Sequence, residues 1–424
     1  MRMTAQSPGW LATQRWFRAK QRPIATVDEV DRAALTADAA LTVLEIAYAD
    51  GGPPDRYLLP RVADREPAAG DGAWRSIAAA ITDGAELRAA HGRFVGTRLS
   101  AVNKEPVTDL TERPIGVEQS NTSVVLGDRL ILKLYRLMEP GENPDLEVGA
   151  YLTDAGFADT PAVIGALHYH APDGQRSTVA MLQTYVPSAG DAWGAMLGAL
   201  ASDPARGIEM AGAIGDLTNR MHEALASRPS DPSFPARPAT TAETAAWRAS
   251  AEAQLTQAVG AVGGDAHARL VELAPRVSAR FADTFGSATG EARVSRIHGD
   301  YHLGQLLART DGGFAVIDFE GEPARPLAER RHPGSPLRDV AGMLRSLDYA
   351  ARTAASSVPG FEPDAWLAQA RRQFLEAYGG MDAGDAGLLD AFELEKACYE
   401  VRYEASNRPA WLWLPLAAIE RLAR

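Results

Sequence analysis

Two polar clusters, each at the end of a short apolar run, contain residue types suited to phosphoryl transfer. The first run begins at Val294 and ends in His298-Gly299-Asp300, and Gln305 follows five residues after Asp300. The second run leads into Asp318-Phe319-Glu320 after a Gly-Gly turn. Transfer of a phosphoryl group to a hydroxyl needs a carboxylate that accepts the hydroxyl proton. It also needs carboxylate and amide oxygens that hold Mg²⁺ against the phosphates.

The order and spacing of the two clusters match those of protein kinases. These enzymes use H-R-D-x-x-x-x-N followed by D-F-G. Asp300 to Gln305 keeps the first spacing, with Gln in place of Asn, and Asp318-Phe319-Glu320 stands where D-F-G would. Either cluster alone would be a weak signal, because an Asp after a Gly at a strand end is usually a turn residue. Together they predict a kinase-type site that contains both sets of oxygens.

A lysine lies inside the apolar run Arg129 to Tyr135, which we expect to be a strand. A lysine in such a run either protects an edge strand or binds phosphate. The helix expected to start near Asn143 carries Glu147, where a kinase helix supplies the acid that pairs with the strand lysine. We therefore predict an ion pair between Lys133 and Glu147.

Two other segments are candidates for nucleotide binding. A polar turn before a strand could cover phosphates with hydroxyl and backbone N–H groups, although it lacks the glycines of G-x-G-x-x-G. Its candidate residues are Ser120, Asn121, Thr122 and Ser123. The strand from Val179 runs into Pro187, where a hinge backbone would pair with an adenine edge, and an ordinary domain linker is the alternative reading. The hinge candidates are Gln183, Tyr185 and Val186.

Composition is typical of a soluble globular protein, with 46% hydrophobic and 23% charged residues in a chain of 424. The net charge of −12 and the lack of a basic stripe argue against nucleic acid as a partner. A single cysteine fits a reducing cytoplasm. The N-terminus has no apolar signal-peptide core, and no run approaches the ~18 apolar residues of a membrane span. We expect a cytoplasmic monomer.

The elements that position these clusters fall into three expected regions. Residues 1–90 read as an α+β cap with a helix at 9–17, strands at 41–49 and 56–62, and a helix at 74–90. Residues 91–187 read as a strand-rich, nucleotide-binding region. Residues 188–424 read as mostly helical, with Arg338 and Asp339 tying a helix at 340–354 to the catalytic loop.

A helix at 388–406 near the C-terminus carries several acids beside aromatic residues. Acids on a helix usually form a solvated face. Next to tyrosines and tryptophans they could also form a sugar platform, with rings against C–H groups and carboxylates for hydroxyls. We list His302, Glu400, Glu404 and Trp413 as candidate contacts with the acceptor.

Taken together, these residues resemble the actinobacterial maltokinase-like enzymes, which are relatives of the aminoglycoside phosphotransferases. The matching segments include Trp10 to Phe17, Glu118 to Ser123, Ile131 to Leu134, Asn143 to Glu147, His298 to Gln305, Asp318 to Arg331, Ser335 to Ser346 and Glu393 to Glu404. The resemblance implies an α+β, bilobal protein-kinase-like fold with an N-terminal cap subdomain and ATP bound between the lobes. It also implies that Lys133 contacts the α/β-phosphates and that Glu147 orients it. Asp300 would be the catalytic base, and Gln305 and Asp318 the Mg²⁺ ligands.

Departures from the maltokinase pattern concern the acceptor. Those enzymes carry Leu where this chain has Tyr301, and they differ at Arg402, Ser406-Asn407 and Trp413. A sister group phosphorylates glucosamine, whose amine would suit carboxylates around Asp300. We therefore expect an ATP- and Mg²⁺-dependent kinase of glucosamine, with a maltokinase that makes maltose 1-phosphate as the alternative. A kinase of another amino sugar is a further option.

Two other classes of function are weaker alternatives. A non-catalytic nucleotide- or sugar-binding module would be favoured if an inert residue replaced any of four residues, and all four are present: Lys133, Asp300, Gln305 and Asp318. A glycosidase could use Glu320 and Glu322 as its carboxylate pair. Both glutamates lie beside the predicted metal ligands, so we favour the kinase.

Overall fold

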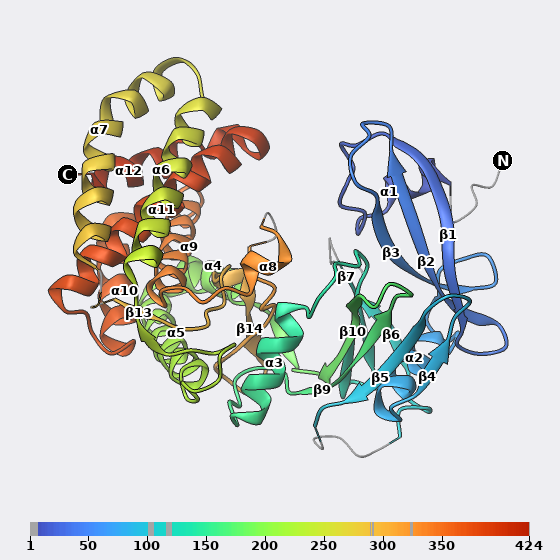
Figure 1. The fold of residues 1–424 in the computed structure, drawn as a ribbon. Coiled ribbons are helices and arrows are strands. Elements are labelled where there is room, and N and C mark those ends of the chain that lie inside the picture. Colours follow the sequence, from blue (N-terminus) through green and yellow to red (C-terminus); the bar gives the residue numbers. More distant parts are fainter. Residues whose placement is uncertain are drawn as a thin grey trace. The chain divides into compact units, whose positions relative to one another are not determined.

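The computed structural model describes residues 7–100, 106–115, 121–288, 290, 292–322 and 325–423. The chain divides into two compact units (Figure 1). Unit 1 comprises Met1–Pro187 and Arg325–Ala328, and unit 2 comprises Ser188–Ala324 and Glu329–Arg424. Within the described residues, none of the helices combines the length and the apolar character needed to cross a membrane.

Unit 1 begins with a short helix and a three-stranded antiparallel sheet. The elements are α1 (Pro8–Thr13), β1 (Ile24–Ala34), β2 (Ala39–Tyr48) and β3 (Asp55–Val62), with sheet order β1-β2-β3. The helix predicted at 9–17 ends early, at Thr13. Trp16 and Phe17 instead follow the helix and pack their rings on Tyr57 of β3 at 5.8 and 5.3 Å. The sequence predicted too long a helix because the buried residues Trp16 and Phe17 continue the apolar pattern of α1.

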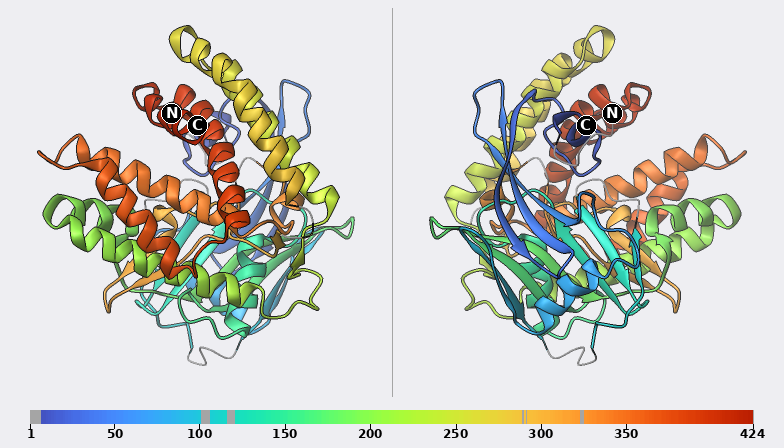
Figure 2. Two further views of the ribbon diagram at one scale, coloured as in Figure 1. Left: turned by 90° about the vertical axis from the view of Figure 1, so that its left-hand side faces the viewer. Right: turned by 90° about the vertical axis from the view of Figure 1, so that its right-hand side faces the viewer.

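The second sheet of unit 1 has seven strands in the order β4-β5-β9-β10-β8-β7-β6. Its cyan and green strands are seen in Figure 2, right. Its strands are β4 (Glu86–Arg88), β5 (Arg93–Arg98), β6 (Glu112–Ile115), β7 (Asn121–Leu126), β8 (Leu130–Tyr135), β9 (Val163–His170) and β10 (Arg176–Thr184). Helices α2 (Ala73–Thr82) and α3 (Pro144–Asp154) accompany it. The helix predicted to reach residue 90 is wrong beyond Thr82, because Gly84 at φ +65° turns the chain into β4.

Strand β8 shows how this sheet presents its lysine. Leu132 and Leu134 are fully buried in the core of unit 1, while Lys133 between them is only partly buried. Successive side chains of a strand point to opposite faces, so the ammonium of Lys133 lies on the face away from that core.

Unit 2 is mostly helical. Its helices are α4 (Ala192–Ser202), α5 (Pro204–Leu225), α6 (Thr241–Ala261), α7 (Gly264–Ser287), α9 (Leu337–Ala355), α10 (Pro363–Ala377), α11 (Ala383–Asn407) and α12 (Trp413–Leu422). The short helix α8 (Leu327–Arg330) is divided, with its first two residues assigned to unit 1 and its last two to unit 2. Rings of Trp247, Phe281, Phe285 and Phe392 meet where α6, α7 and α11 pack together. This aromatic cluster fixes α11, which contributes to the site described below. The helices of unit 2 face the viewer in Figure 2, left.

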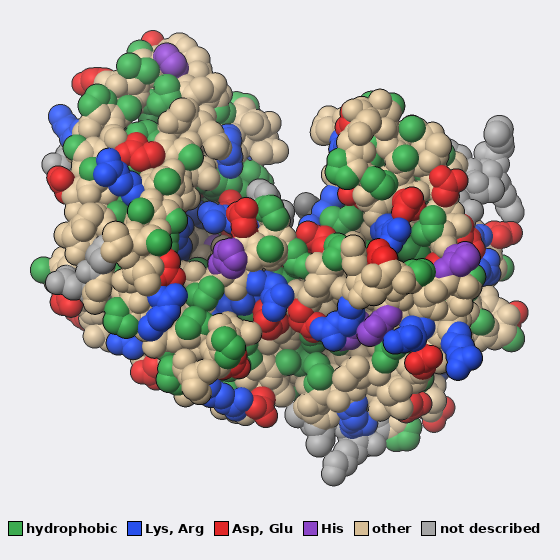
Figure 3. Space-filling view, viewed as in Figure 1, with side chains coloured by type: hydrophobic (Ala, Val, Ile, Leu, Met, Phe, Trp, Pro, Cys, Tyr) green, Lys and Arg blue, Asp and Glu red, His purple; other side chains and the backbone are tan. Residues whose placement is uncertain are grey.

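Two small sheets complete unit 2. One has the order β11-β14-β15, with β11 (Ser188–Asp191), β14 (Leu306–Arg309) and β15 (Phe314–Val316), and the other joins β12 (Arg237–Pro238) to β13 (Arg293–Val294). β14 and β15 form the antiparallel hairpin that precedes Asp318. On the face shown in Figure 3, the described acidic and basic side chains are interspersed rather than gathered by sign.

Candidate active site

The loop that carries Asp300 is anchored by one buried carboxylate. Asp339, in the first turn of α9, is 1% exposed and accepts hydrogen bonds from the backbone N–H groups of His298 (2.8 Å) and Gly299 (2.9 Å). His222 of α5 donates a third through Nε2 at 3.1 Å. Burial alone would raise the pKa of Asp339, but these donors outweigh it and hold the pKa below its usual value. The predicted tie between Asp339 and the catalytic loop is confirmed.

Arg338, which we expected to share that role, turns to another helix. Its guanidinium pairs with Glu395 of α11 at 3.0 Å and lies over the ring of Phe392 at 4.5 Å. Arg338 therefore joins α9 to α11, and it is Asp339 that holds the loop.

His298 joins the catalytic loop to the segment after β15. Its Nε2 donates to the carbonyl of Ile317 at 3.0 Å, and its Nδ1 accepts from the Asp300 N–H at 3.3 Å. A carbonyl can only accept, so the ring is held with the proton on Nε2. The ring also lies 4.9 Å from that of Phe319. His298 thus fixes Asp300 relative to Asp318, the residue between Ile317 and Phe319.

The two loops approach each other through glycines. Gly299 and Gly321 have φ values of +85° and +70°, which favour glycine. A Cβ added to Gly299 would lie 3.3 Å from the Cα of Gly321. The close approach explains why a glycine precedes Asp300 in the sequence pattern.

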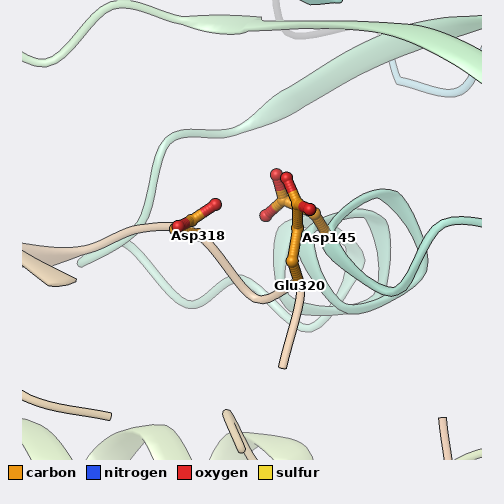
Figure 4. A group of neighbouring side chains, drawn as sticks. All are labelled: Asp145, Asp318 and Glu320. Carbon is orange, nitrogen blue, oxygen red and sulfur yellow. The ribbon is translucent and has the colours of Figure 1, made fainter. Parts of the chain in front are cut away.

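Gln305 and Asp318 lie at the base of one hairpin. The Ile317 N–H donates to the Gln305 carbonyl at 3.0 Å, which continues the pairing of β14 with β15. Asp318 has a positive φ of 69°, and its side chain and that of Glu320 project from the same turn (Figure 4). Oxygens of these two carboxylates lie within 4.8 Å of one another. Glu320, which sequence reasoning did not select as a ligand, could therefore share a cation with Asp318.

Asp300 faces a lysine that sequence reasoning did not select. The ammonium of Lys396 on α11 lies 3.6 Å from Asp300 Oδ1, and the two side chains are 31% and 23% exposed. Burial lowers the pKa of Lys396, but the carboxylates of Asp300, Glu322 and Glu400 outweigh it and raise the pKa above its usual value. Only four of the 43 Lys and Arg residues are lysine, and this rarity is the feature of the sequence that could have singled out Lys396.

His302 and Tyr301 follow Asp300 and differ in what they can contact. His302 Nδ1 accepts from the Gly304 N–H at 3.0 Å, and burial lowers the pKa of the ring. A contact of His302 with an acceptor would therefore use Nε2. Tyr301 is 3% exposed, and its hydroxyl lies 3.0 Å from Thr218 Oγ1 on α5. The side chain of Tyr301 therefore packs inside unit 2, and its effect on the choice of acceptor stays a prediction.

The two predicted acceptor carboxylates have structural partners. Glu400 binds the buried guanidinium of Arg345 at 2.7 and 3.0 Å. Glu404 accepts from the hydroxyl of Tyr349 at 3.0 Å and pairs with Arg408 at 2.6 Å. The bonds to Arg345 and Tyr349 join α11 to α9, and the pair of Glu404 with Arg408 lies at the C-terminal end of α11. Trp413, at the start of α12, is 53% exposed.

In unit 1, Lys133 pairs with an acid in the first turn of α3. Its Nζ lies 2.7 Å from Asp145 Oδ2, and the Tyr135 hydroxyl donates to the same oxygen at 3.0 Å. Asp145 is drawn on its helix in Figure 4. Sequence reasoning placed the acid two residues later, at Glu147, which occupies the same first turn.

The candidate phosphate-covering residues lie mostly in a strand. Ser120 falls outside the described residues, and Asn121 to Ser123 belong to β7 rather than to the expected turn. The hydroxyl of Thr122 accepts from Arg136 Nε at 2.8 Å, and Ser123 is 1% exposed. The Ser123 side chain is thus enclosed, and the covering of phosphates by this segment stays a prediction.

The candidate hinge is the end of β10 and the residues after it. Gln183 pairs with Ile131 and Val163 in the sheet. The Tyr185 N–H donates to the Arg129 carbonyl at 2.8 Å. A base edge would thus have to use other backbone groups of this segment, among them those of Val186.

The comparisons with known proteins cover both units. Residues 111–389 match the model of the phosphotransferase enzyme family, and residues 10–91 match the maltokinase N-terminal cap domain. A glucosamine kinase of Streptacidiphilus jiangxiensis is 34% identical over 331 residues, 73% of this chain and 72% of that protein. One of Mycolicibacterium smegmatis is 30% identical over 381 residues, 83% of this chain and 90% of that protein.

Solved structures agree with the sequence relatives. A glucosamine kinase in complex with glucosamine, ADP and inorganic phosphate superposes with a TM-score of 0.74 at 28% identity, covering 99% of this chain and all of that one. A second crystal form of glucosamine kinase gives a TM-score of 0.77 at 28% identity, covering 99% of this chain and 98% of that one. The predicted α+β protein-kinase-like fold is confirmed, and the chain belongs to the phosphotransferase enzyme family.

Proposed function

We propose that the protein is a glucosamine kinase that transfers the γ-phosphoryl group of ATP to a hydroxyl of the sugar. The observation that carries the proposal is the catalytic loop, in which Asp339 and His298 hold Asp300 beside the turn that bears Asp318. Similarity to glucosamine kinases over most of the chain supports the choice of acceptor.

In the proposed reaction, Asp300 orients the acceptor hydroxyl and takes its proton. A bond forms between the hydroxyl oxygen and the γ-phosphorus as the bond from that phosphorus to the β–γ bridging oxygen breaks, which releases ADP. Most of the catalysis is positioning and charge stabilisation. The rigid attachment of the Asp300 loop to α9 supplies that positioning.

Asp318 and Gln305 are the proposed Mg²⁺ ligands, and Glu320 adds a nearby carboxylate. The cation, when bound, would neutralise charge on the transferred phosphoryl group. Three oxygen-bearing side chains at the base of one hairpin fit a hard cation that keeps several waters.

Unit 1 would bind the nucleotide. Lys133, oriented by Asp145, would contact the α/β-phosphates, and Glu147 stays a candidate for the same orienting role. Residues 120–123 stay candidates for covering the phosphates, and the segment from Gln183 to Val186 would receive the base.

For the acceptor, His302 Nε2 and Trp413 are the proposed contacts beside Asp300. Glu400 and Glu404 would act through the helices they join, since Arg345 and Arg408 engage their carboxylates. A maltokinase is the second candidate, favoured by the match of residues 10–91 to the maltokinase cap. We also propose that the protein works as a monomer in the cytoplasm, where ATP is available.

The acceptor is tested by coupled ADP release from Mg·ATP with glucosamine, N-acetylglucosamine, glucose, maltose and an aminoglycoside. The proposal predicts turnover with glucosamine and a kcat/KM at least about tenfold lower for each other sugar. Preferred turnover of maltose would replace it with the maltokinase alternative.

A further inference from the structure

We propose that Lys396 is a positioning residue that acts through Asp300, by holding one oxygen of its carboxylate so that the other receives the acceptor proton. The inference rests on the proposed function, because it assigns Asp300 the role of base.

The geometry of the pair supports this division of labour. Lys396 Nζ lies 3.6 Å from Oδ1 of Asp300, a distance typical of an ion pair rather than of a short hydrogen bond. An ionised carboxylate can accept at both oxygens, so the ammonium at Oδ1 leaves Oδ2 for the acceptor hydroxyl. The pair is only partly exposed, so water screens it less than it would a surface pair.

The surroundings of Lys396 make the ammonium a fixed feature of the site. Glu322 after β15, and Tyr399 and Glu400 on α11, act on it electrostatically in addition to Asp300. Its Nζ lies 4.8 Å from the centre of the Tyr399 ring, within the range of a cation–π contact. The same neighbours that raise its pKa keep it charged at neutral pH.

The helix that bears Lys396 is itself held in place. Glu395, the preceding residue, accepts from Ser250 Oγ at 2.7 Å and pairs with Arg338 at 3.0 Å. Glu400, one turn later, is bound by Arg345 of α9. Because α9 also carries Asp339, one helix fixes both the loop of Asp300 and the helix of Lys396.

Residue type also favours a specific role. Four lysines occur in a chain that otherwise uses arginine for its positive charges, and Lys133 and Lys396 are two of them. Lysine presents a compact charge with rotatable donors, whereas a planar guanidinium would form a two-pronged contact that occupies both carboxylate oxygens. A lysine at this position leaves the second oxygen available.

The test compares steady-state kinetics of Lys396→Met with those of wild type in phosphate transfer from Mg·ATP to glucosamine. The expected result is a kcat lower by roughly 10- to 100-fold, with the KM for ATP within about twofold of wild type. The matched control is Arg280→Met. It removes an ion pair with Asp390 of the same helix, at 2.6 Å with side chains 33% and 36% exposed. It should keep wild-type kcat. A Lys396→Met enzyme with wild-type kcat would overturn the inference.

Restoring the charge separates a positioning role from a loss of folding. In Lys396→Cys, alkylation of the thiol by 2-bromoethylamine displaces bromide and creates a thioether analogue of lysine. Cys398, the protein's own single cysteine, is fully buried, so treated wild type is the control for selectivity. Recovery of kcat on treatment supports the role of the ammonium. No recovery in a folded, fully modified protein contradicts it.

A double variant decides whether Lys396 acts through Asp300. Adding Lys396→Met to Asp300→Asn should cause no further loss of the residual rate, since the two residues would act as a unit. A further tenfold loss would mean that the lysine contacts the transferred phosphate directly, and would overturn the positioning role. If Asp300→Asn alone retained wild-type turnover, the proposed function itself would fail. That outcome is therefore distinguishable from failure of the inference.

Discussion

The backbone N–H of Gly299 donates a 2.9 Å hydrogen bond to Oδ1 of Asp339, forty residues later in the chain. Oδ2 of the same carboxylate accepts from His298 and from His222. One buried side chain thereby satisfies two backbone donors of the catalytic loop and ties α5 and α9 to it. The position of Asp300 therefore depends on this arrangement as well as on the local conformation of the loop.

Replacing Asp339 should lower stability and activity together. In wild type the His298 N–H, the Gly299 N–H and His222 Nε2 all donate to the Asp339 carboxylate. The amide group of Asp339→Asn would direct its own hydrogens at some of these donors, which should lower the free energy of unfolding by about 2–4 kcal/mol. It should also lower kcat, because the loop of Asp300 loses its anchor. Denaturant unfolding and steady-state kinetics measure the two effects. Asp390→Asn on α11 is the control, and an equal effect there would contradict the assignment.

The same carboxylate predicts a pH dependence of stability. The pKa of Asp339 is lower in the folded protein than its ordinary value of about 3.9, so its contribution is complete above that value and is lost as the pH falls through the folded pKa. The difference in unfolding free energy between wild type and Asp339→Asn should be constant from pH 7 to pH 5 and shrink at more acidic pH. If this difference in unfolding free energy grew as the pH fell, the pKa of Asp339 would be raised rather than lowered by folding, which contradicts the prediction.

Tyr301 tests whether a departure from the maltokinase pattern changes the acceptor. Its hydroxyl bonds Thr218, which also donates to the Ile214 carbonyl, so Tyr301→Phe should cost only about 0.5–1.5 kcal/mol of stability. Because the ring is enclosed, the ratio of kcat/KM for glucosamine and maltose should stay within about twofold in both Tyr301→Phe and Tyr301→Leu. A switch towards maltose in Tyr301→Leu would contradict the structural reading.

Glu400 distinguishes a structural acid from one that binds the sugar. Glu400→Gln removes one of the two buried carboxylates that Arg345 faces, the other being Asp348 at 2.6 Å, and should cost roughly 2 kcal/mol of stability. The double variant Arg345→Met with Glu400→Met should recover part of that loss. Neither of the two charges is then left without the other, and Asp348, the second partner of Arg345, keeps Arg352 and Arg421. A large rise in the KM for glucosamine with unchanged stability would instead show that Glu400 binds the sugar. Thermal unfolding with and without glucosamine, together with kinetics, decides between them.

The sequence predicted the parts of the site that are local in the chain. The spacing from Asp300 to Gln305 and the turn with Asp318 lie within one loop and one hairpin, so motif spacing was sufficient. The helices at 340–354 and 388–406 were also predicted, and the observed α9 and α11 begin three and five residues earlier. Strand β1 was missed because its many polar side chains, such as Glu29 and Arg32, leave no apolar run.

Contacts between distant segments could not be predicted in the same way. Lys396 lies beside Asp300 because α11 packs on α9, and the spacing of residues along the sequence does not predict which helices pack together. The direction of Tyr301 was likewise undetermined until α5 supplied Thr218. The acid that meets Lys133 depended on helical phase, because Asp145 and Glu147 both lie in the first turn of α3 and a shift of two residues turns a helix by about 200°. The division at residue 90 between cap and nucleotide-binding region stays a prediction.

Asp300→Asn tests the central claim most directly. The substitution keeps the shape of the side chain but removes the proton acceptor, so turnover of glucosamine should fall by at least about a hundredfold. The Kd for Mg·ATP, measured by calorimetry on the same protein, should remain within about twofold of the wild-type value, because the residues proposed to bind the nucleotide are unchanged. Loss of turnover with intact nucleotide binding is the result that the account predicts. Wild-type turnover in Asp300→Asn would contradict it.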